Sequence, residues 1–336
     1  MQETEQQLPA VDLTVVMPTH NRRQMLRETL DALARQTYPA DRFEIVIMCD
    51  GDSDGTYEML RELAMPFRLR PFAQPQSGPA TARNNGVARA TAPVVLFLDD
   101  DIIALPELLA EHIRLHQDRP NRVVVGRLLP DPDVKLAGWT AWEQHIFDNR
   151  YRALEQMEMP VDGRKFYSGN VSVDRAAFLA VGGFNAAYKR AEDIELGYRL
   201  QKAGAQFFFN GRAAGIHRGV HSFEAWSRTQ YNYGRYDVQL AQVEGHKELM
   251  PIASWFRQRN ALNRLLGRIA VGRPGLRRPL LAFAHATARA ADRADLQRIS
   301  RWSYSAMANL CYWQGVADQL GGAERLWQMV RSAGTT

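Results

Sequence analysis

Residues 93–103 read P-V-V-L-F-L-D-D-D-I-I, an apolar run that leads into Asp99, Asp100 and Asp101. The run has the length of a strand buried on both faces rather than that of a helix. In open α/β sheets, ligands bind at the carboxyl ends of such strands. Three adjacent carboxylates repel one another, and their oxygens suit Mg²⁺ or Mn²⁺, ions that also bind phosphates. The stretch therefore predicts either a metal site or a solvated acidic turn.

Strand-like and helix-like segments alternate on both sides of this stretch. Residues 13–18 and 43–48 are short apolar runs, and apolar residues recur at helical spacing after each of them. This alternation predicts an α/β domain with a parallel sheet. Further along the chain the pattern is helical only. We therefore expect an α/β domain over residues 10–221 and a helical region over residues 222–336.

The composition is that of a globular protein. The chain has 336 residues, of which 46% are hydrophobic and 24% charged, enough for a large core and an appended region. Cys49 and Cys311 form neither a disulfide framework nor a metal-spaced pair, which fits a reducing cytoplasm. No apolar run reaches about 18 residues, so we expect no membrane-spanning helix.

Seven short motifs follow one another along the α/β region. They are V-V-M-P-T-H-N-R at 15–22, D-G-D-S-D-G-T at 50–56, A-R-N-N-G at 82–86, F-L-D-D-D at 97–101, G-N-V-S at 169–172, V-G-G-F at 181–184 and E-D-I-E-L-G-Y-R-L at 192–200. In this order, from Asp12 to about Gly234, the chain resembles the family 2 glycosyltransferases, which are inverting, nucleotide-sugar-dependent enzymes. The resemblance implies a GT-A, Rossmann-like fold: a mixed, mainly parallel sheet flanked by helices, here with a helical C-terminal extension.

The resemblance also implies a nucleotide-sugar donor, with a UDP-sugar favoured over a GDP- or dTDP-sugar. Pro18, Thr19 and Asp50 are expected at the nucleoside, although the family's usual Asp-Asp pair is Cys49-Asp50 here. The alternative for Asp50 is a role in its own turn. Arg83 is expected to bind the diphosphate, or alternatively to form an ion pair with the Asp-rich turn.

The aspartate motif implies a divalent ion, Mn²⁺ or Mg²⁺. Asp99 and Asp101 are two residues apart on what we expect to be an extended strand end, so they should project to the same side. In the family this element binds the metal, and Asp100 or Asp99 reaches the ribose. His217 is expected as the third metal ligand, with His221 as the competing candidate. The ion would neutralise the leaving diphosphate.

Glu192 and Asp193 open a predicted helix, a position that the helix dipole alone favours for acids. The resemblance implies that Asp193 is the general base that takes the proton of the acceptor hydroxyl. Glu192 would then orient the acceptor or the donor sugar. Gly169 and Asn170 are expected to line the sugar pocket, where a glycine permits close approach.

Two other classes of function stay open. A non-catalytic, sugar-nucleotide-binding component of a polysaccharide assembly complex would share the fold, although the intact acidic motifs argue against it. A nucleotidyltransferase would need a glycine-rich, lysine-bearing loop where this chain has T-H-N-R at 19–22. For a transferase, the acceptor would be a glycan, a lipid-linked molecule or a small molecule.

The net charge of +5 is unevenly distributed, because arginines gather in the helical region. Over residues 255–278 they interleave with apolar residues at roughly helical spacing. This pattern predicts peripheral attachment to the cytoplasmic face of a membrane. The alternative is that the apolar side packs on the α/β domain while the arginines are solvated or pair with acids. No stacking-aromatic pattern accompanies the charge, so we expect no nucleic-acid binding.

Overall fold

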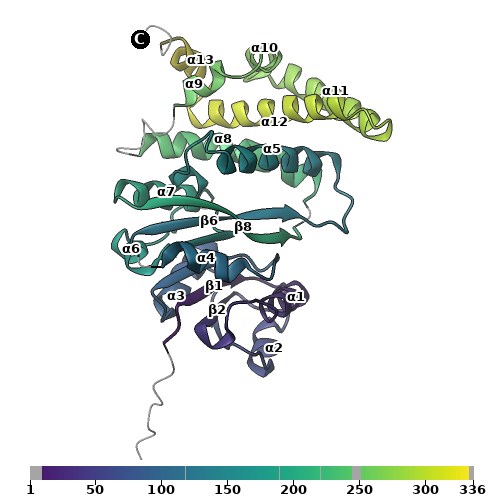
Figure 1. The fold of residues 1–336 in the computed structure, drawn as a ribbon. Coiled ribbons are helices and arrows are strands. Elements are labelled where there is room, and N and C mark those ends of the chain that lie inside the picture. Colours follow the sequence, from purple (N-terminus) through teal and green to yellow (C-terminus); the bar gives the residue numbers. More distant parts are fainter. Residues whose placement is uncertain (1–9, 118, 189, 220, 244–250, 333–336) are drawn as a thin grey trace, which may run out of the picture. The chain divides into compact units, whose positions relative to one another are not determined.

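The computed structural model describes residues 10–117, 119–188, 190–219, 221–243 and 251–332. Figure 1 shows the course of the chain, which divides into two compact units. The first unit is Met1–Pro132 with Arg150–Gly219, and the second is Asp133–Asn149 with Val220–Thr336. The second unit therefore includes a segment, residues 133–149, that the sequence analysis assigned to the α/β domain.

The first unit is built on one eight-stranded sheet with the order β3-β2-β1-β4-β7-β6-β8-β5. The strands are β1 Leu13–Thr19, β2 Phe43–Asp50, β3 Arg68–Gln74, β4 Val94–Leu98, β5 Ile102–Ala104, β6 Arg122–Pro130, β7 Asn170–Asp174 and β8 Gln206–His217. The pairs β1–β2, β1–β4, β2–β3 and β6–β8 are parallel, whereas β7 is antiparallel to β4 and β6, and β5 is antiparallel to β8. The predicted mixed, mainly parallel sheet is confirmed.

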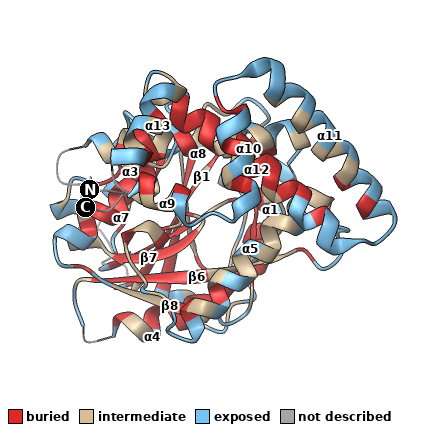
Figure 2. Ribbon diagram, turned by 90° about the horizontal axis from the view of Figure 1, so that it is seen from above, coloured by how far each residue is buried: buried red, intermediate tan, exposed pale blue. Residues whose placement is uncertain are grey.

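Helices flank this sheet. They are α1 Arg23–Leu33, α2 Thr56–Glu62, α3 Pro79–Arg89, α4 Leu108–His116, α6 Arg175–Ala180 and α7 Glu192–Lys202, with short 3-10 turns η1 Ala40–Arg42 and η2 Gly163–Lys165. Side chains of the central strands alternate between two apolar clusters, because successive strand residues face opposite sides of a sheet. Val15 packs in the cluster that holds Leu26 of α1, and Val16 in the one that holds Val87 of α3. The strands are thus buried on both faces (Figure 2).

The stretch that opens the sequence analysis is not one continuous strand. β4 ends at Leu98, and the three aspartates form a turn in which the Ile102 N–H donates to the Asp99 carbonyl at 3.2 Å. Ile102 then begins the separate strand β5. The last strand, β8, runs as far as His217, and its later part pairs with β5, with His217 opposite Ile102.

The second unit is helical. Its helices are α8 Phe223–Gln242, α9 Ile252–Arg257, α10 Ala261–Ala270, α11 Pro274–Arg293, α12 Gln297–Gln319 and α13 Ala323–Ser332, and α5 Gly138–Glu155 begins in it. Helices α8 and α12 approach closely at Gly234 and Gly315. A Cβ atom at either glycine would lie 2.0 Å from a backbone oxygen of the other helix. The predicted helical C-terminal region is confirmed.

Aromatic packing explains why residues 133–149 belong to the second unit. Trp139 of α5 meets Phe223 of α8 with 5.7 Å between the ring centroids, and Trp142 meets Trp226 at 5.8 Å. Aromatic pairs at such edge-to-face geometry add to the gain from burying their surface. Across the described ranges, no helix combines the length and the apolar character needed to cross a membrane.

Candidate functional site

Several residues predicted for the site lie together at the carboxyl ends of the parallel strands. Because β1, β2 and β4 are parallel, their carboxyl ends lie together and bring Thr19, Asp50 and Asp99 to the same edge. β7 is antiparallel to β4, so its first residue, Asn170, pairs with Leu98 there. This is the edge at which open α/β sheets bind ligands.

Arg83 joins two of the predicted acidic elements. It extends from α3 and is only 5% exposed. One guanidinium nitrogen donates to Asp99 Oδ1 at 2.7 Å, and another lies 3.3 Å from Glu192 Oε1 at the start of α7. The ring of Phe184 lies 5.7 Å from the guanidinium carbon. A buried cation needs such compensation, and here it draws the aspartate turn and the acid pair of α7 into one cluster.

The ion pair expected as an alternative role for Arg83 is therefore present. The predicted contact of Arg83 with a diphosphate stays a prediction. Its planar, forked guanidinium is suited to a phosphate as well as to carboxylates, and Asp99 keeps a 37% exposed side chain on the outer side of the pair.

Asp100 and Asp101 share a different cation. Arg22 donates to Asp100 Oδ1 at 2.8 Å and to Asp101 Oδ2 at 2.9 Å, and the Thr19 hydroxyl donates to Asp100 Oδ2 at 2.7 Å. Burial raises the pKa of Asp100 to about 6, although Thr19 and Arg22 oppose the rise. Asp100 is buried and bonded within the protein, so in this structure its carboxylate does not reach outward toward a ribose.

The expectation that Asp99 and Asp101 project to one side does not hold. It assumed an extended strand end, whereas the backbone here is a turn. Asp99 faces Arg83, and Asp101 shares Arg22 with its neighbour. Sequence reasoning quoted Arg22 only as part of a motif. The signal that could have singled it out is its place in the turn after the first predicted strand, whose carboxyl end was expected beside the three aspartates.

Asp101 and His217 form the best candidate for a metal site. Asp101 Oδ1 is buried without a hydrogen-bond partner, and His217 Nε2 lies 3.7 Å from it. His217 is the last residue of β8, and the competing candidate, His221, belongs to the second unit. Within the described part of the chain, no three or more His, Cys, Asp or Glu side chains cluster as a metal site. Asp101 and His217 are thus two candidate ligands rather than a complete set.

Glu192 and Asp193 occupy the first turn of α7, as predicted. Asp193 Oδ1 accepts a hydrogen bond of 2.7 Å from the N–H of Ile194. Burial and the nearby charge of Glu192 raise the pKa of Asp193 to about 7. A carboxyl group that changes its protonation near neutral pH suits proton transfer.

Asp50 lies on the nucleotide side of the predicted site but is fully bonded to its own surroundings. Its Oδ1 accepts from the Ser77 N–H at 2.7 Å and from the Gln74 amide at 2.8 Å, and its Oδ2 accepts from the Gly78 N–H at 2.8 Å. These bonds tie the end of β2 to the loop that begins α3. The turn-organising role left open for Asp50 is therefore observed, and base recognition stays a prediction.

The two residues predicted to line the sugar pocket, Gly169 and Asn170, have different surroundings. A Cβ atom at Gly169 would lie 3.1 Å from Asp99 Oδ2, so the glycine does leave the carboxylate room. Asn170 is only 1% exposed, and its amide group donates to the carbonyls of Ala213 and Arg127. Asn170 thus holds strands together, and it leaves no amide donor for a sugar.

A buried polar network was missed by sequence reasoning. His112 and His116 of α4 lie 2.8 Å from the hydroxyl of Ser172, and His112 also lies 2.9 Å from Asn170 Oδ1. Burial lowers the pKa of His112 to about 4 and that of His116 to about 3. Their spacing of four residues was the available signal, since it places both rings on one face of a helix.

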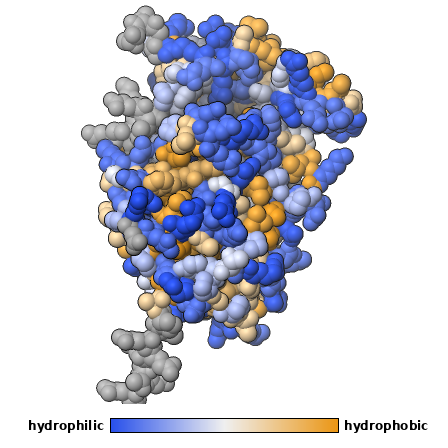
Figure 3. All heavy atoms as spheres, in the orientation of Figure 1, coloured by the Kyte–Doolittle hydropathy of each residue, from blue (hydrophilic) through white to orange (hydrophobic). Residues whose placement is uncertain are grey.

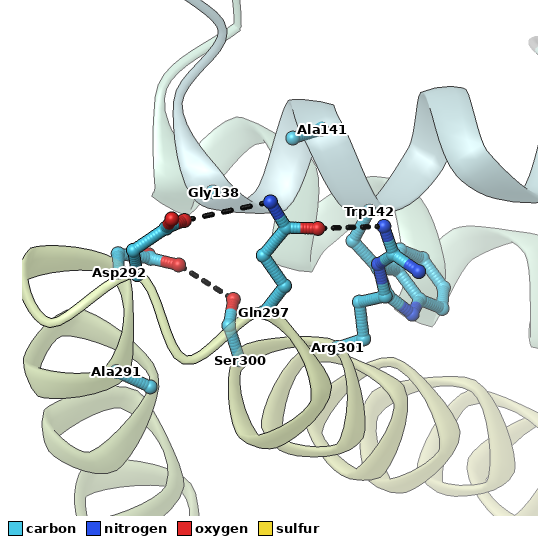
Figure 4. Close-up of a pocket in the computed structure, with 9 residues that line it drawn as sticks. Gly138, Ala141, Trp142, Ala291, Asp292, Gln297, Ser300 and Arg301 are labelled. Carbon is cyan, nitrogen blue, oxygen red and sulfur yellow. Dashed lines mark hydrogen bonds between the residues drawn. The ribbon is translucent and has the colours of Figure 1, made fainter.

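A hollow lined by polar and apolar residues lies in the second unit, between the start of α5, the end of α11 and the start of α12 (Figure 4). Its lining groups bond to one another: Ser300 donates to Asp292 at 2.5 Å, and Arg301 donates to Gln297 at 3.1 Å. None of the predicted site residues lines it. The candidate site residues lie instead at the carboxyl ends of the parallel strands.

Comparison with known proteins finds matches among glycosyltransferases. Residues 14–180 match the model of Glycosyl transferase family 2, and residues 148–223 match the model of the N-terminal domain of galactosyltransferase. Validoxylamine A glucosyltransferase from Streptomyces hygroscopicus subsp. jinggangensis is 31% identical over 274 residues, covering 72% of this chain and 63% of that protein. The chain thus spans somewhat less than two thirds of this relative's length.

Two solved structures resemble this one in fold. The mannosyltransferase PcManGT from Pyrobaculum calidifontis, in complex with GDP-Man and Mn²⁺, has a TM-score of 0.62 at 19% identity, covering 91% of this chain and 88% of that one. S. aureus TarS 1–349, in complex with UDP-GlcNAc, has a TM-score of 0.54 at 16% identity, covering 93% of each chain. The predicted GT-A fold is confirmed.

Proposed function

We propose that this chain, which belongs to glycosyl transferase family 2, transfers a sugar from a nucleotide-sugar donor to an acceptor hydroxyl. The observation that carries the proposal is the Arg83 cluster, in which one buried cation contacts both Asp99 and Glu192. The aspartates after β4 are the donor-side element, and the acids of α7 are the acceptor-side element. Their proximity gives one site the groups for both halves of a transfer.

Asp193 is the proposed general base. In a single displacement with inversion, one carboxylate must accept the acceptor hydroxyl's proton as the new bond forms. The pKa of Asp193, near 7, leaves it partly ionised at neutral pH and able to hold the proton it receives. Glu192 is held by Arg83 and therefore acts in positioning the acceptor or the donor sugar rather than as the base.

The proposed donor is a UDP-sugar, and a GDP- or dTDP-sugar is the second candidate. The GDP-Man and UDP-GlcNAc complexes of two proteins with this fold support a nucleotide-sugar without choosing between the bases. Pro18, Thr19 and Asp50 stand at the strand ends where the nucleoside would bind, and Arg83 is the cation proposed to face the diphosphate.

Asp101 and His217 fit a divalent ion, Mn²⁺ or Mg²⁺. An unpartnered buried carboxylate oxygen is a donor atom that both ions accept, whereas the imidazole nitrogen beside it suits Mn²⁺ better than the harder Mg²⁺. Magnesium in particular binds through one or two carboxylates plus substrate phosphates and water, so an incomplete protein ligand set is in keeping with it. A bound ion would neutralise charge on the leaving diphosphate.

A donor screen tests the function. The chain is incubated with UDP-, GDP- and dTDP-sugars, and release of the nucleoside diphosphate is measured for the wild type and for Asp193→Asn. We expect release from one donor class, weak with water alone and faster with an acceptor. Binding of a donor by calorimetry without release under any acceptor condition would favour the non-catalytic alternative. Proton NMR of the product's anomeric centre tests inversion.

A further inference from the structure

Helix α10 carries an apolar stripe that the protein does not cover. Leu262, Leu265 and Ile269 follow one another at helical spacing and are 52%, 55% and 38% exposed. Residues three and seven apart share one face of a helix. The buried positions of α10 are Asn263, Gly267 and Ala270, so the helix packs through a different face. The stripe is therefore exposed while the helix itself is firmly packed.

The two helices that pack beside α10 also carry exposed apolar residues. Leu276 and Phe283 are exposed on one face of α11, and Ile299 and Trp302 are exposed in the first turns of α12. Figure 2 shows exposed residues along α11, and Figure 3 shows apolar side chains over α10 and α11 among hydrophilic ones. We call these exposed apolar residues of α10, α11 and α12, with the arginines between them, the basic apolar surface.

The arginines of this region are not neutralised by acids. Residues 251–332 contain thirteen arginines and no lysine against four acids, so they hold more than the whole chain's net charge of +5. In the described ranges, no arginine from Arg257 onward lies within ion-pair distance of a carboxylate. Two of the acids are used elsewhere, since Asp292 accepts from Ser300 and Asp318 accepts from Tyr231.

The apolar residues of 255–278 fall into a buried set and an exposed set. Phe256 and Val271 do pack in the core of the second unit, but Leu262, Leu265 and Leu276 remain exposed. The alternative, in which the apolar side packs on the α/β domain while the arginines are solvated or pair with acids, stays a prediction, but the exposed leucines of α10 and of the start of α11 favour the membrane interpretation. An exposed apolar stripe flanked by unpaired arginines is the arrangement of a helix that lies in a membrane interface.

We infer that the basic apolar surface attaches the protein to an anionic lipid bilayer. Apolar side chains would enter the acyl boundary, while the long arginine side chains keep their charged ends at the headgroups. A symmetric pairing of two copies through this surface would place arginine against arginine, which opposes it. Nucleic acid would neutralise the charge but leave the leucine stripe in water. The inference is independent of the proposed transfer reaction.

Co-sedimentation with lipid vesicles tests the inference on the full chain. Vesicles of phosphatidylcholine alone are compared with vesicles that also contain phosphatidylglycerol, at low and high salt. We expect binding to the anionic vesicles at low salt and its loss at high salt, because screening weakens surface attraction. Equal binding to both vesicle types, or none to either at low salt, would overturn the inference.

Matched variants distinguish binding through the basic apolar surface from binding that depends only on net charge or on any exposed apolar residue. Arg268→Glu is compared with Arg35→Glu, an exposed arginine of the first unit with the same change of charge. Leu265→Ser is compared with Leu179→Ser, which is 48% exposed on α6. We expect vesicle affinity to fall at least about fivefold for Arg268→Glu, since each arginine near an anionic surface contributes that factor. We expect a several-fold fall for Leu265→Ser and little change in either control.

The remaining outcomes count against the inference. Equal losses in the control variants would mean that binding follows net charge alone. A lipid-free dimer, measured by light scattering and dissociated by Leu265→Ser, would assign the surface to a second copy. Tight binding to a random DNA duplex, unaffected by Leu265→Ser, would assign the arginines to nucleic acid. Donor turnover in solution is measured in parallel, so that a failed transferase and a failed membrane contact are told apart.

Discussion

The Arg83 guanidinium donates a 2.7 Å hydrogen bond to the carboxylate of Asp99, which follows it by sixteen residues and lies beyond the next strand. The pair joins the N-terminal part of α3 to the turn after β4. The same guanidinium also contacts Glu192, so Arg83 lies between the two acidic elements of the candidate site.

Replacing Arg83 with alanine should destabilise the fold. The change leaves Glu192 buried without its cation, and breaking a buried pair costs about 3–5 kcal/mol. Since Asp99 is partly exposed, we expect a loss of about 2–4 kcal/mol in the free energy of unfolding, measured by urea denaturation. Arg27→Ala is the control, because its pair with Asp31 is about half-exposed and is worth at most about 1 kcal/mol. Equal losses in the two variants would contradict this account.

Asp193→Asn should abolish transfer and spare donor binding. The amide cannot accept the acceptor's proton, so turnover should fall about 10²- to 10⁴-fold. Donor affinity, measured by calorimetry, should stay near the wild-type value because Thr19 and Asp50, which we propose contact the nucleoside, lie on β1 and β2 rather than on α7. Glu224→Gln, an acid in the first turn of α8, is the matched control and should keep full turnover. A folded Asp193→Asn protein with near-normal turnover would remove Asp193 from the base role.

The raised pKa of Asp193 has a pH signature of its own. The folded protein holds a proton on Asp193 up to pH about 7, whereas an unfolded aspartate loses it near about 3.9. Between these values the folded state binds more protons, so this group's contribution to stability falls as pH rises. Turnover should rise with pH through the same region as the base ionises. Asp193→Asn should remove this part of the slope in urea unfolding measured from pH 4 to 7, and an unchanged slope would refute the assignment.

Chelation tests the metal. EDTA should abolish turnover, and Mn²⁺ or Mg²⁺ should restore it. Asp101→Asn and His217→Gln should each weaken Mn²⁺ binding measured by electron paramagnetic resonance, whereas His285→Gln in the second unit should not. Full turnover of metal-free protein would overturn the metal proposal for both residues.

The buried histidines of α4 should make the fold sensitive to acid. Burial lowers the pKa of His112 to about 4 and that of His116 to about 3, below the unfolded value of about 6.5. As pH falls below about 6.5, the histidines bind protons in the unfolded state but stay neutral in the folded state. The free energy of unfolding therefore decreases, by up to about 1.4 kcal/mol per pH unit for each histidine. The double variant His112→Gln, His116→Gln should flatten this slope, which is opposite in sign to that of Asp193. A double variant as acid-sensitive as the wild type would show that the network is not the cause.

Much of the fold follows from local sequence. The apolar runs at 13–18 and 43–48 form β1 and β2, because a strand buried on both faces has to be apolar at nearly every position. The acids at 192 and 193 begin a helix, as the dipole favours. The polar residues that follow β1, β2 and β4 also lie close together, because the carboxyl ends of parallel strands are at the same end of the sheet.

Only the tertiary structure decided which groups meet. Ile102 pairs with β8, a strand more than a hundred residues further along the chain, and the aspartates before it therefore form a turn. Because of this turn, Asp99 and Asp101 contact different partners. The side-chain amide of Asn170 donates hydrogen bonds to backbone carbonyls of two other strands, β6 and β8. The exposure of the α10 stripe likewise depends on which face meets α12, where Asn263 reaches Ser305. Spacing in a sequence tells which residues share a face, but what covers that face is set by long-range packing.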